Sequence, residues 1–156
     1  MLTTYNDPSG FPRVINCFVE GTIVNTPEGF IPIEEIEKGQ VILSMDIETG
    51  TVEHDIVESS IHSDAEVIFR ISLESGETVM VTSEHPFYLS DRKWVKASNI
   101  KVGDLLVDMN NEEVAVVKIE QMEADRTVYN IQVRKNENYF VSRSKVLVHN
   151  KNINHM

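Results

Sequence analysis

The stretch Val146-Leu147-Val148-His149-Asn150-Lys151, near the end of the chain, decides how the rest of the sequence is interpreted. Its three apolar residues predict a buried strand that ends in a His-Asn pair. An Asn side-chain amide can attack its own main-chain carbonyl through a five-membered ring, which cuts the following peptide bond without water. Correct orientation contributes roughly 7–11 kcal/mol to such a reaction, and the His149 imidazole, with an ordinary pKa of about 6.5, can carry protons near neutral pH. A His-Asn pair is also a common strand end, so this chemistry needs partners elsewhere in the chain.

The charge balance of the chain limits its partners. The 156 residues include 14 Lys and Arg against 25 Asp and Glu, which gives a formal net charge of −11 at pH 7. A surface of this sign repels phosphate backbones, so we expect no nucleic-acid partner. No apolar run of about 18 residues predicts a membrane span. The length and the 41% of hydrophobic residues suit one globular domain, which we expect to be a monomer.

Cys17 is the sole cysteine of the chain, which rules out an internal disulfide. It is therefore either a small buried hydrophobe or a reactive thiol. No Cys or His pair in the sequence has the close spacing of a structural zinc site. The sequence therefore predicts no metal and no cofactor.

Short β-type runs that alternate with turn residues predict an all-β fold. The expected strands include 22–24, 41–45, 67–73, 78–82 and 146–148. Helical signal is limited to single turns such as 33–38, which Gly39 ends. In residues 1–16 we expect Pro8, Gly10 and Pro12 to break any regular element, so the domain begins at Cys17.

The sequence also repeats itself imperfectly. Residues 33–42 match 97–106 at an offset of 64, and residues 68–73 match 128–133 at an offset of 60. Any two alternating strands look alike, but here the turn residues between the strands match in length as well. We interpret the repeat as a duplicated β unit, which would bring corresponding strand ends to one centre around a pseudo-twofold axis.

Thr82 and His85 follow one of the predicted strands and are further candidates for chemistry. Pro86 disfavours helical torsions at His85, so both side chains lie on an extended segment or turn and can point at one peptide group. The alternative for His85 is a half-buried strand histidine that is hydrogen-bonded to backbone.

Together these pieces resemble the Hint family of self-processing domains, and among them inteins and type A bacterial intein-like domains. The matching segments, in order, are residues 17–22, Gly29, residues 33–39, Thr82-x-x-His85, residues 128–131 and residues 146–150. The resemblance implies an all-β horseshoe or disk of short strands, with pseudo-twofold duplication and both ends in one active centre. Residues 17–150 are then the domain, without an inserted endonuclease, and residues 1–16 and 151–156 are its upstream and downstream flanks.

At the upstream junction, the resemblance implies that Cys17 attacks the carbonyl of Asn16 and converts that peptide bond into a thioester. A thiolate is a good nucleophile, and the ring that forms has five members. The resemblance makes His85 the residue that assists this step. Thr82 matches the residue that polarises the same scissile bond.

At the downstream junction, the resemblance implies that His149 and Asn150 cut the peptide bond that follows them. Two positions depart from the family pattern. Many relatives carry Asp where Asn130 stands, and His where Glu137 or Asn138 stands. Asn130 and Glu137 are therefore auxiliary candidates, and the proton relays of this step differ from those of the family.

The residue after the terminal Asn is the largest departure. Inteins that splice by the standard route carry Cys, Ser or Thr there, whereas this chain carries Lys151, whose ammonium has an ordinary pKa of about 10.4. A variable residue at this position is typical of bacterial intein-like domains, so we expect flank cleavage with some splicing.

The resemblance thus implies a bacterial, single-turnover enzyme whose substrates are its own flanks. It would react in a reducing cytoplasm, whether or not the host protein is later secreted. Two alternatives stay open. One is a hedgehog-type domain that transfers the thioester to an external nucleophile, and the other is a catalytically silent β module that binds a partner.

Overall fold

The computed structural model describes residues 4–6, 12–14 and 17–150, which form strands and two single 3-10 turns. The strands are β1 Thr4–Asn6, β2 Pro12–Val14, β3 Phe18–Val19, β4 Ile23–Thr26, β5 Gly29–Pro32, β6 Val41–Asp46, β7 Thr51–Leu73, β8 Thr78–Val81, β9 Pro86–Tyr88, β10 Trp94–Lys96, β11 Leu105–Val107, β12 Glu113–Val133, β13 Asn138–Val141 and β14 Val146–His149. The 3-10 turns are η1 Ile33–Glu35 and η2 Ala97–Asn99. In these ranges no helix has the length and apolar character needed to cross a bilayer. The prediction of an all-β fold is confirmed.

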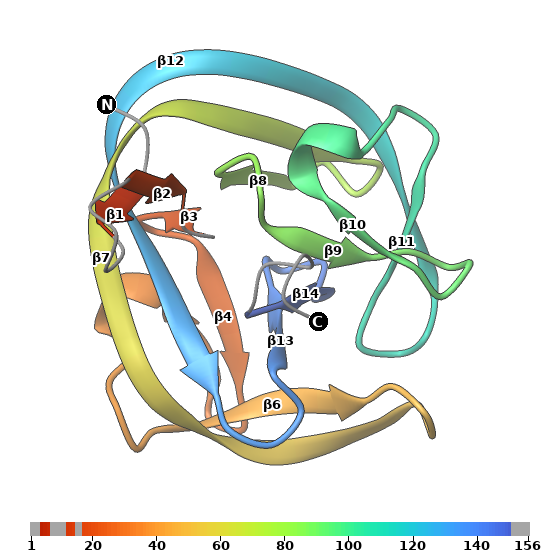
Figure 1. Cartoon of the computed structure of the whole chain (residues 1–156). Coiled ribbons are helices and arrows are strands. Elements are labelled where there is room, and N and C mark those ends of the chain that lie inside the picture. Colours follow the sequence, from red (N-terminus) through yellow and green to blue (C-terminus); the bar gives the residue numbers. More distant parts are fainter. Residues whose placement is uncertain (1–3, 7–11, 15–16, 151–156) are drawn as a thin grey trace.

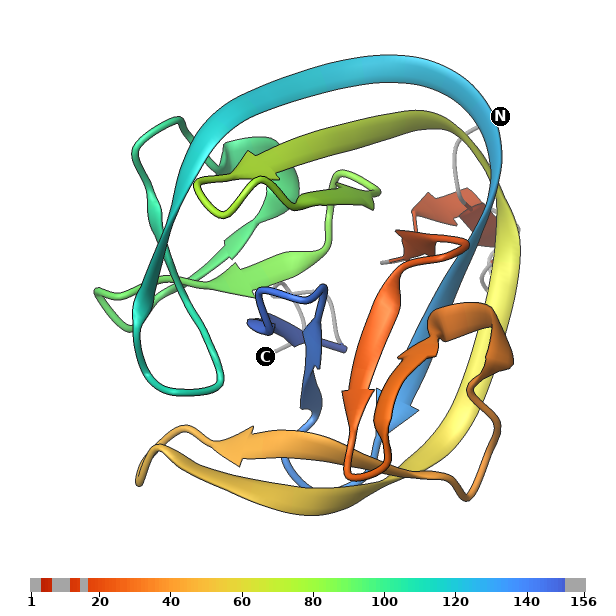
Figure 2. The same cartoon turned by 180° about the vertical axis from the view of Figure 1, so that it is seen from behind.

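Two six-stranded antiparallel sheets build the domain. One has the strand order β10-β9-β14-β13-β4-β5, and the other has the order β11-β12-β3-β8-β7-β6, with β12 also paired to β7. The β7–β12 ribbon curves around the other strands, so that β13 and β14 lie in the interior of a horseshoe-like ring (Figure 1 and Figure 2). The final strand, which carries the His-Asn pair, is thus enclosed by the rest of the domain.

The strands β7 and β12 are much longer than the sequence predicts. The predicted strand 67–73 and the matching segment 128–133 are the last parts of strands of 23 and 21 residues. Residues 51–66 are largely polar and half-exposed, so they show no apolar run that would mark a strand. Residues 51–56 pair with β6 in a hairpin. The residues from 57 onward pair with the distant β12, with bulges that let the ribbon bend.

Hydrogen bonds repeat between the two halves of the chain. Gly39 N–H donates to Val57 O at 2.8 Å, and its counterpart Gly103 N–H donates to Val116 O, also at 2.8 Å. Both glycines have a positive φ, of 90° and 95°, which glycine adopts without steric cost. The turns η1 and η2 that precede them each close with one backbone bond of 3.2 Å. The predicted duplication is therefore confirmed at the level of single bonds.

Aromatic side chains at the centre of the core position the candidate residues. Phe18, Phe87 and Tyr139 are all fully buried, and burying a side chain of this kind contributes roughly 1.5–3 kcal/mol. Phe18 packs edge-on against both of the others, with ring centroids 6.2 Å apart in each pair. Because Phe18 directly follows Cys17, this packing also fixes where the thiol lies.

Part of the upstream flank has regular structure, contrary to our expectation. Strands β1 and β2 pair antiparallel, with Asn6 opposite Pro12. The prediction that prolines and glycine break every element in residues 1–16 is wrong for these two strands. Pro12 is the first residue of its strand, a position where a missing N–H is tolerated.

Candidate active site

Cys17 and Thr82 lie side by side, although 65 residues separate them. Cys17 N–H donates to Thr82 Oγ1 at 3.0 Å, and Thr82 N–H donates to Cys17 O at 2.9 Å. The Thr82 hydroxyl is also 3.3 Å from Cys17 O, to which it donates. The register of β3 and β8, in which Phe18 pairs with Val81, brings the two residues together. The Thr82 hydroxyl therefore contacts the amide nitrogen of the bond that the sequence predicts to be cut upstream.

His85 is fully buried, not half-buried as the alternative for this residue assumed. Its ring packs on that of Phe18, with ring centroids 4.1 Å apart. The ring centroids of Phe87 and Tyr139 lie 6.3 and 6.4 Å from that of His85. The backbone N–H of His85 is 3.5 Å from the backbone carbonyl oxygen of Thr82, and this contact closes the turn that both residues share. The imidazole thus contacts the side chain that directly follows the nucleophile.

The Cys17 thiol is enclosed by apolar side chains. Val19, Ala65, Ile68 and Val128 form a buried cluster with it. This burial raises the pKa of the Cys17 thiol well above its ordinary range. Since the thiolate is the nucleophile, attack by this residue requires a base that removes the proton or a movement that lets water approach.

Asn150 is buried directly after β14 and is held by main-chain groups. Its N–H donates to Glu137 O at 2.9 Å, and its Nδ2 donates to Val133 O at 3.3 Å. Its Oδ1 is buried and has no hydrogen-bond partner among the described residues. Glu137, an auxiliary candidate, contacts Asn150 through its carbonyl group and has a positive φ of 57°.

The Asn150 carbonyl oxygen, which belongs to the bond that the sequence predicts to be cut downstream, accepts two side-chain hydrogen bonds. Asn130 Nδ2 donates to it at 3.2 Å, and Gln132 Nε2 donates to it at 3.4 Å. The Tyr139 hydroxyl donates to Asn130 Oδ1 at 3.2 Å. Gln132 and Tyr139 are not among the site residues that the sequence predicts. The strand period of two could have identified Gln132, because residues two apart lie on the same face of a strand.

His149 lies on β14 opposite Asn138 of β13. Its ring packs edge-on against Trp94, with centroids 4.8 Å apart, and Trp94 in turn packs on Tyr88 at 4.7 Å. The Asn138 side chain bonds to both main-chain polar groups of Met45, at 2.8 and 2.9 Å. Asn138 therefore anchors the strand opposite His149 to the edge of β6.

Strand β12 connects the upstream and downstream groups. Phe18 pairs with Tyr129, and the same register continued by one residue sets Cys17 opposite Asn130. Tyr139 is fully buried and contacts this centre through its hydroxyl, which donates to Asn130 Oδ1. Burial, and secondly the nearby Cys17, raise the pKa of this hydroxyl well above its ordinary range.

The structure thus places the sequence candidates Cys17, Thr82, His85, Asn130 and Asn150 around one buried centre, with His149 adjacent to it. The scissile-bond neighbours Asn16 and Lys151 lie outside the described residues.

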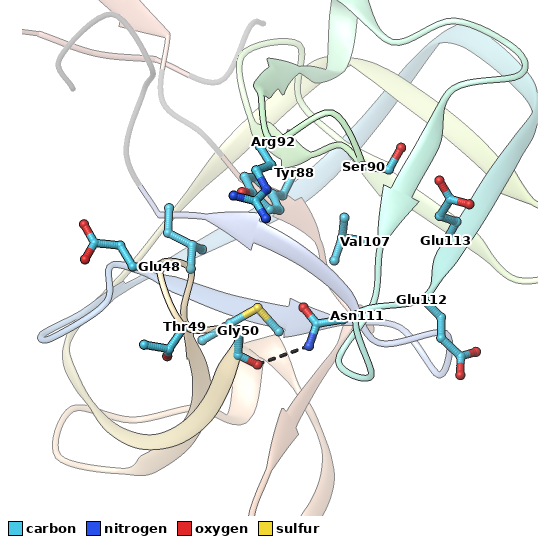
Figure 3. Close-up of a pocket in the computed structure, with 12 residues that line it drawn as sticks. Glu48, Thr49, Gly50, Tyr88, Ser90, Arg92, Val107, Asn111, Glu112 and Glu113 are labelled. Atoms are coloured by element: carbon cyan, nitrogen blue, oxygen red, sulfur yellow. Dashed lines mark hydrogen bonds between the residues drawn. The ribbon is translucent and has the colours of Figure 1, made fainter.

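A surface cleft of about 640 Å³ lies apart from this centre (Figure 3). It is lined by Met45, Ile47, Glu48, Thr49, Gly50, Tyr88, Ser90, Arg92, Val107, Asn111, Glu112 and Glu113. Asn111 Nδ2 donates to Gly50 O at 3.1 Å and joins two hairpin turns, one from each half of the chain. In the part of the chain that the structure describes, no three His, Cys, Asp or Glu residues gather closely enough to hold a metal ion. None of the candidate residues at the buried centre lines this cleft.

A duplicated all-β fold with a thiol, a buried imidazole and an enclosed His-Asn pair at its two ends defines the Hint class of self-processing domains. The chain belongs to the pretoxin Hint domain family, whose family model matches residues 23–151. The resemblance inferred from the sequence is thereby confirmed, and the fold and family support self-processing as the general activity.

Solved structures of similar proteins agree with this assignment. The bacterial intein-like domain from Clostridium thermocellum is 31% identical, with a TM-score of 0.83 over 86% of this chain and 98% of that one. The gp41-1 intein is 25% identical, with a TM-score of 0.73 over 86% and 98% of the two chains. The DnaB intein from Synechocystis sp. PCC 6803, at 15% identity and a TM-score of 0.75 over 87% and 99%, shows likeness of fold alone. A comparison with curated proteins gives no match.

Proposed function

We propose that the chain is a single-turnover enzyme that cuts itself at Asn16–Cys17 and at Asn150–Lys151. The observation that supports this most directly is that polar side chains contact one group of each scissile bond. Thr82 contacts the Cys17 amide nitrogen, and Asn130 and Gln132 contact the Asn150 carbonyl oxygen. A structural module has no need for such contacts at both of its ends.

In the upstream reaction, Cys17 Sγ bonds to the carbonyl carbon of Asn16 and the bond from that carbon to Cys17 N breaks. The thiol loses its proton, and the departing amine gains one. His85 carries this proton, since it shares a turn with Thr82 and contacts the residue after the nucleophile. The Thr82 hydroxyl holds the departing nitrogen in place.

In the downstream reaction, Asn150 Nδ2 bonds to the carbonyl carbon of its own residue and the bond to Lys151 N breaks. Nδ2 loses a proton, the Lys151 amine gains one, and the domain ends in a succinimide. His149 lies next to this bond and carries the proton near neutral pH.

Lys151 makes ligation of the two flanks a minor outcome. Its ammonium side chain is protonated at neutral pH, but its α-amine, once free, has an ordinary pKa of about 7.7–8.0. That amine can attack the Cys17 thioester in competition with water and join Asn16 to Lys151. The flanks are thus the substrate, and the family assignment suggests a toxin precursor from a bacterium as the host. A free thiol also requires a reducing compartment during the reaction.

Intact-mass measurements on the full chain test this proposal. Dithiothreitol or hydroxylamine should release residues 1–16 from the parent chain but not from Cys17→Ala. Loss of residues 151–156 should occur in the parent and in Cys17→Ala, but not in Asn150→Ala. Release of residues 1–16 from Cys17→Ala would contradict the thioester. A sterol adduct would instead indicate hedgehog-type transfer, and an unchanged mass under every thiol condition would indicate a silent module.

A further inference from the structure

The Asn150 carbonyl oxygen accepts more hydrogen bonds than are needed to hold its strand in place. Its residue is already anchored by the bond from its own N–H to Glu137 O at 2.9 Å, and β14 pairs with β13 up to His149. One donor would be enough to satisfy a buried carbonyl. Here two neutral carboxamides, from Asn130 and Gln132, point at the same oxygen.

The sequence of β12 produces this convergence. Asn130 and Gln132 are two positions apart, so both lie on one face of the strand, while Ile131 between them is fully buried in the apolar core. Asn130 is itself almost completely buried, and Gln132 is half-buried. Hydrogen bonds in such surroundings are electrostatically stronger than in water.

We propose that Asn130 and Gln132 form an oxyanion site for the cyclisation of Asn150, with Tyr139 as the residue that positions Asn130. The inference rests on the proposed function. When Nδ2 attacks, the carbonyl carbon becomes tetrahedral and its oxygen takes a negative charge. Collapse restores the carbonyl, expels the Lys151 amine and transfers one proton from Nδ2 to that amine. Donors aimed at the oxygen stabilise the charged state more than the starting carbonyl.

Tyr139 determines which way the Asn130 side chain points. With Nδ2 toward Asn150 O, Asn130 Oδ1 accepts a hydrogen bond from the Tyr139 hydroxyl at 3.2 Å. The flipped amide would set two oxygens against each other at the Asn150 carbonyl. Burial, and secondly Cys17, raise the pKa of the Tyr139 hydroxyl, so that the hydroxyl keeps its proton and donates.

Alanine variants measure the size of the effect. In the full chain, we expect Asn130→Ala to slow the loss of residues 151–156 by roughly 100- to 1,000-fold, the range for removal of one oxyanion donor. Gln132→Ala should have a smaller effect, because its contact is longer. A far-UV circular dichroism spectrum like that of the parent, measured in the same samples, would show that the fold is intact.

Charge variants give a readout that a structural role would not change. In Asn130→Asp a carboxylate faces the developing charge, whereas the protonated acid can donate a hydrogen bond. The ratio of variant to parent cleavage rate should therefore rise as the pH falls from about 8 to about 5. Cys17, His85, Glu137, Tyr139 and His149 are the titratable groups around the site, and both proteins contain them. Gln121→Glu, at an exposed position of the same strand, is the control and should give a ratio that does not vary with pH.

A double-mutant cycle tests Tyr139. Tyr139→Phe keeps the packed ring and should slow Asn150 cleavage about tenfold in the parent but have no further effect in Asn130→Ala, because it acts through Asn130. Equal slowing in both backgrounds would make Tyr139 merely structural.

The outcomes separate this inference from the proposed function. A parent chain that never loses residues 151–156 overturns both. A parent that cuts after Asn150, together with Asn130→Ala and Gln132→Ala variants that cut as fast, or with a pH-independent ratio for Asn130→Asp, overturns the oxyanion site alone.

Discussion

Two equivalent turns of the duplicated fold have different roles. Residues 82–85 lead from β8 to β9 in the first half, and residues 142–145 lead from β13 to β14 in the second. Each turn has a backbone contact from its fourth residue to its first, at 3.5 Å in the first half and 3.0 Å in the second. Sequence and topology therefore treat the two segments as copies of one unit.

The side chains of the two turns show the difference. The hydroxyl of Thr82 bonds to Cys17, the first residue of the domain, 65 positions earlier in the sequence. The hydroxyl of Ser142 accepts a bond of 2.9 Å from Ser144 N–H, inside its own turn. Ser142 and Lys145 have positive φ, of 68° and 56°, whereas Thr82 does not. The first-residue hydroxyl thus contacts another segment in the first turn, whereas in the second turn it is used inside the turn.

If the proposed function is correct, the duplicated fold has a reaction centre at only one of two equivalent places. Pro86 after the first turn favours an extended conformation at His85, so the preceding side chains point away from the local backbone. The second turn has Val146 at the equivalent position and adopts left-handed torsions instead. A paired variant in each turn tests this distinction.

The largest expected effect comes from the fourth residues of the turns. His85→Ala should slow the thiol-induced release of residues 1–16 by roughly 100- to 10,000-fold, the contribution of a positioned acid or base. Lys145→Asn should leave this rate unchanged, because Asn tolerates a positive φ. The measurement is the intact mass of both variants over time with dithiothreitol. If His85→Ala is within twofold of the parent, the first turn is as structural as the second.

The loops 74–77 and 134–137 are a second pair of equivalent segments. Here it is the loop in the second half of the chain that depends on a distant side chain. The first loop closes through its own backbone, with Gly76 N–H donating to Leu73 O at 2.9 Å. The second depends on Asp55 of β7, whose carboxylate accepts bonds of 2.9 Å from the N–H groups of Lys135 and Asn136. This second loop carries the carbonyl that holds Asn150 N–H.

Asp55→Asn should therefore weaken the second loop. We expect a loss of roughly 1.5–3 kcal/mol in the free energy of unfolding, the contribution of a hydrogen bond to a charged group. Chemical denaturation measures it. The exposed Asp91, which accepts a bond of 3.2 Å from Lys93 N–H in a local turn, supplies the control variant Asp91→Asn, with a change within about 0.5 kcal/mol. Equal losses of unfolding free energy in Asp55→Asn and Asp91→Asn would contradict a special role of Asp55.

The same carboxylate makes stability depend on pH. Burial acts to raise the pKa of Asp55, but backbone bonds from Asn136, Lys135 and Ile56 and the hydroxyl of Ser44 outweigh it and lower the pKa below its ordinary value. A lowered pKa stabilises the folded state fully above the unfolded value of about 3.9, and this stabilisation is lost as the pH falls further. The difference in unfolding free energy between the parent and Asp55→Asn should thus shrink below about pH 4. A constant difference at every pH would mean that the charge is not the cause.

The smallest effect concerns the first residues of the turns. Thr82→Val keeps the shape but loses the hydroxyl, and should slow upstream cleavage about tenfold, the equivalent of one hydrogen bond of roughly 1.4 kcal/mol. Ser142→Gly, which accepts the positive φ, should leave this rate unchanged. The two rates are compared by intact mass, as above, and a slower Ser142→Gly would show that the two turns are coupled.

The sequence predicts those features that depend on nearby residues. The strands around 41–45 and 146–148 have local apolar patterns, and the turn signals at Gly39 and Gly103 are visible without a structure. Cys17 is buried among apolar side chains, as one of its two sequence interpretations expects. The other interpretation, a reactive thiol, stays a prediction.

Features that depend on distant partners were beyond sequence reasoning. Asp55 is one acidic residue among many until the loop about 80 residues later is placed beside it. Gln132 resembles any polar strand residue until Asn150 lies against it. Much of the length of β7 and β12 follows from their mutual pairing, which no local pattern contains.

The pairing of β3 with β12 also has a mechanical consequence. A pull on the two flanks enters the domain at Cys17 and leaves it at Asn150, and both residues are attached to neighbouring positions of β12. We therefore expect the pulling force to pass from Cys17 to Asn150 through only a few bonds. Most of the curved β7–β12 ribbon would then carry no tension. We expect stretching to open the reaction centre before the fold unravels, which single-molecule force measurements on the full chain would record as a small extension ahead of the main unfolding event. Tension between the flanks would then switch the domain off.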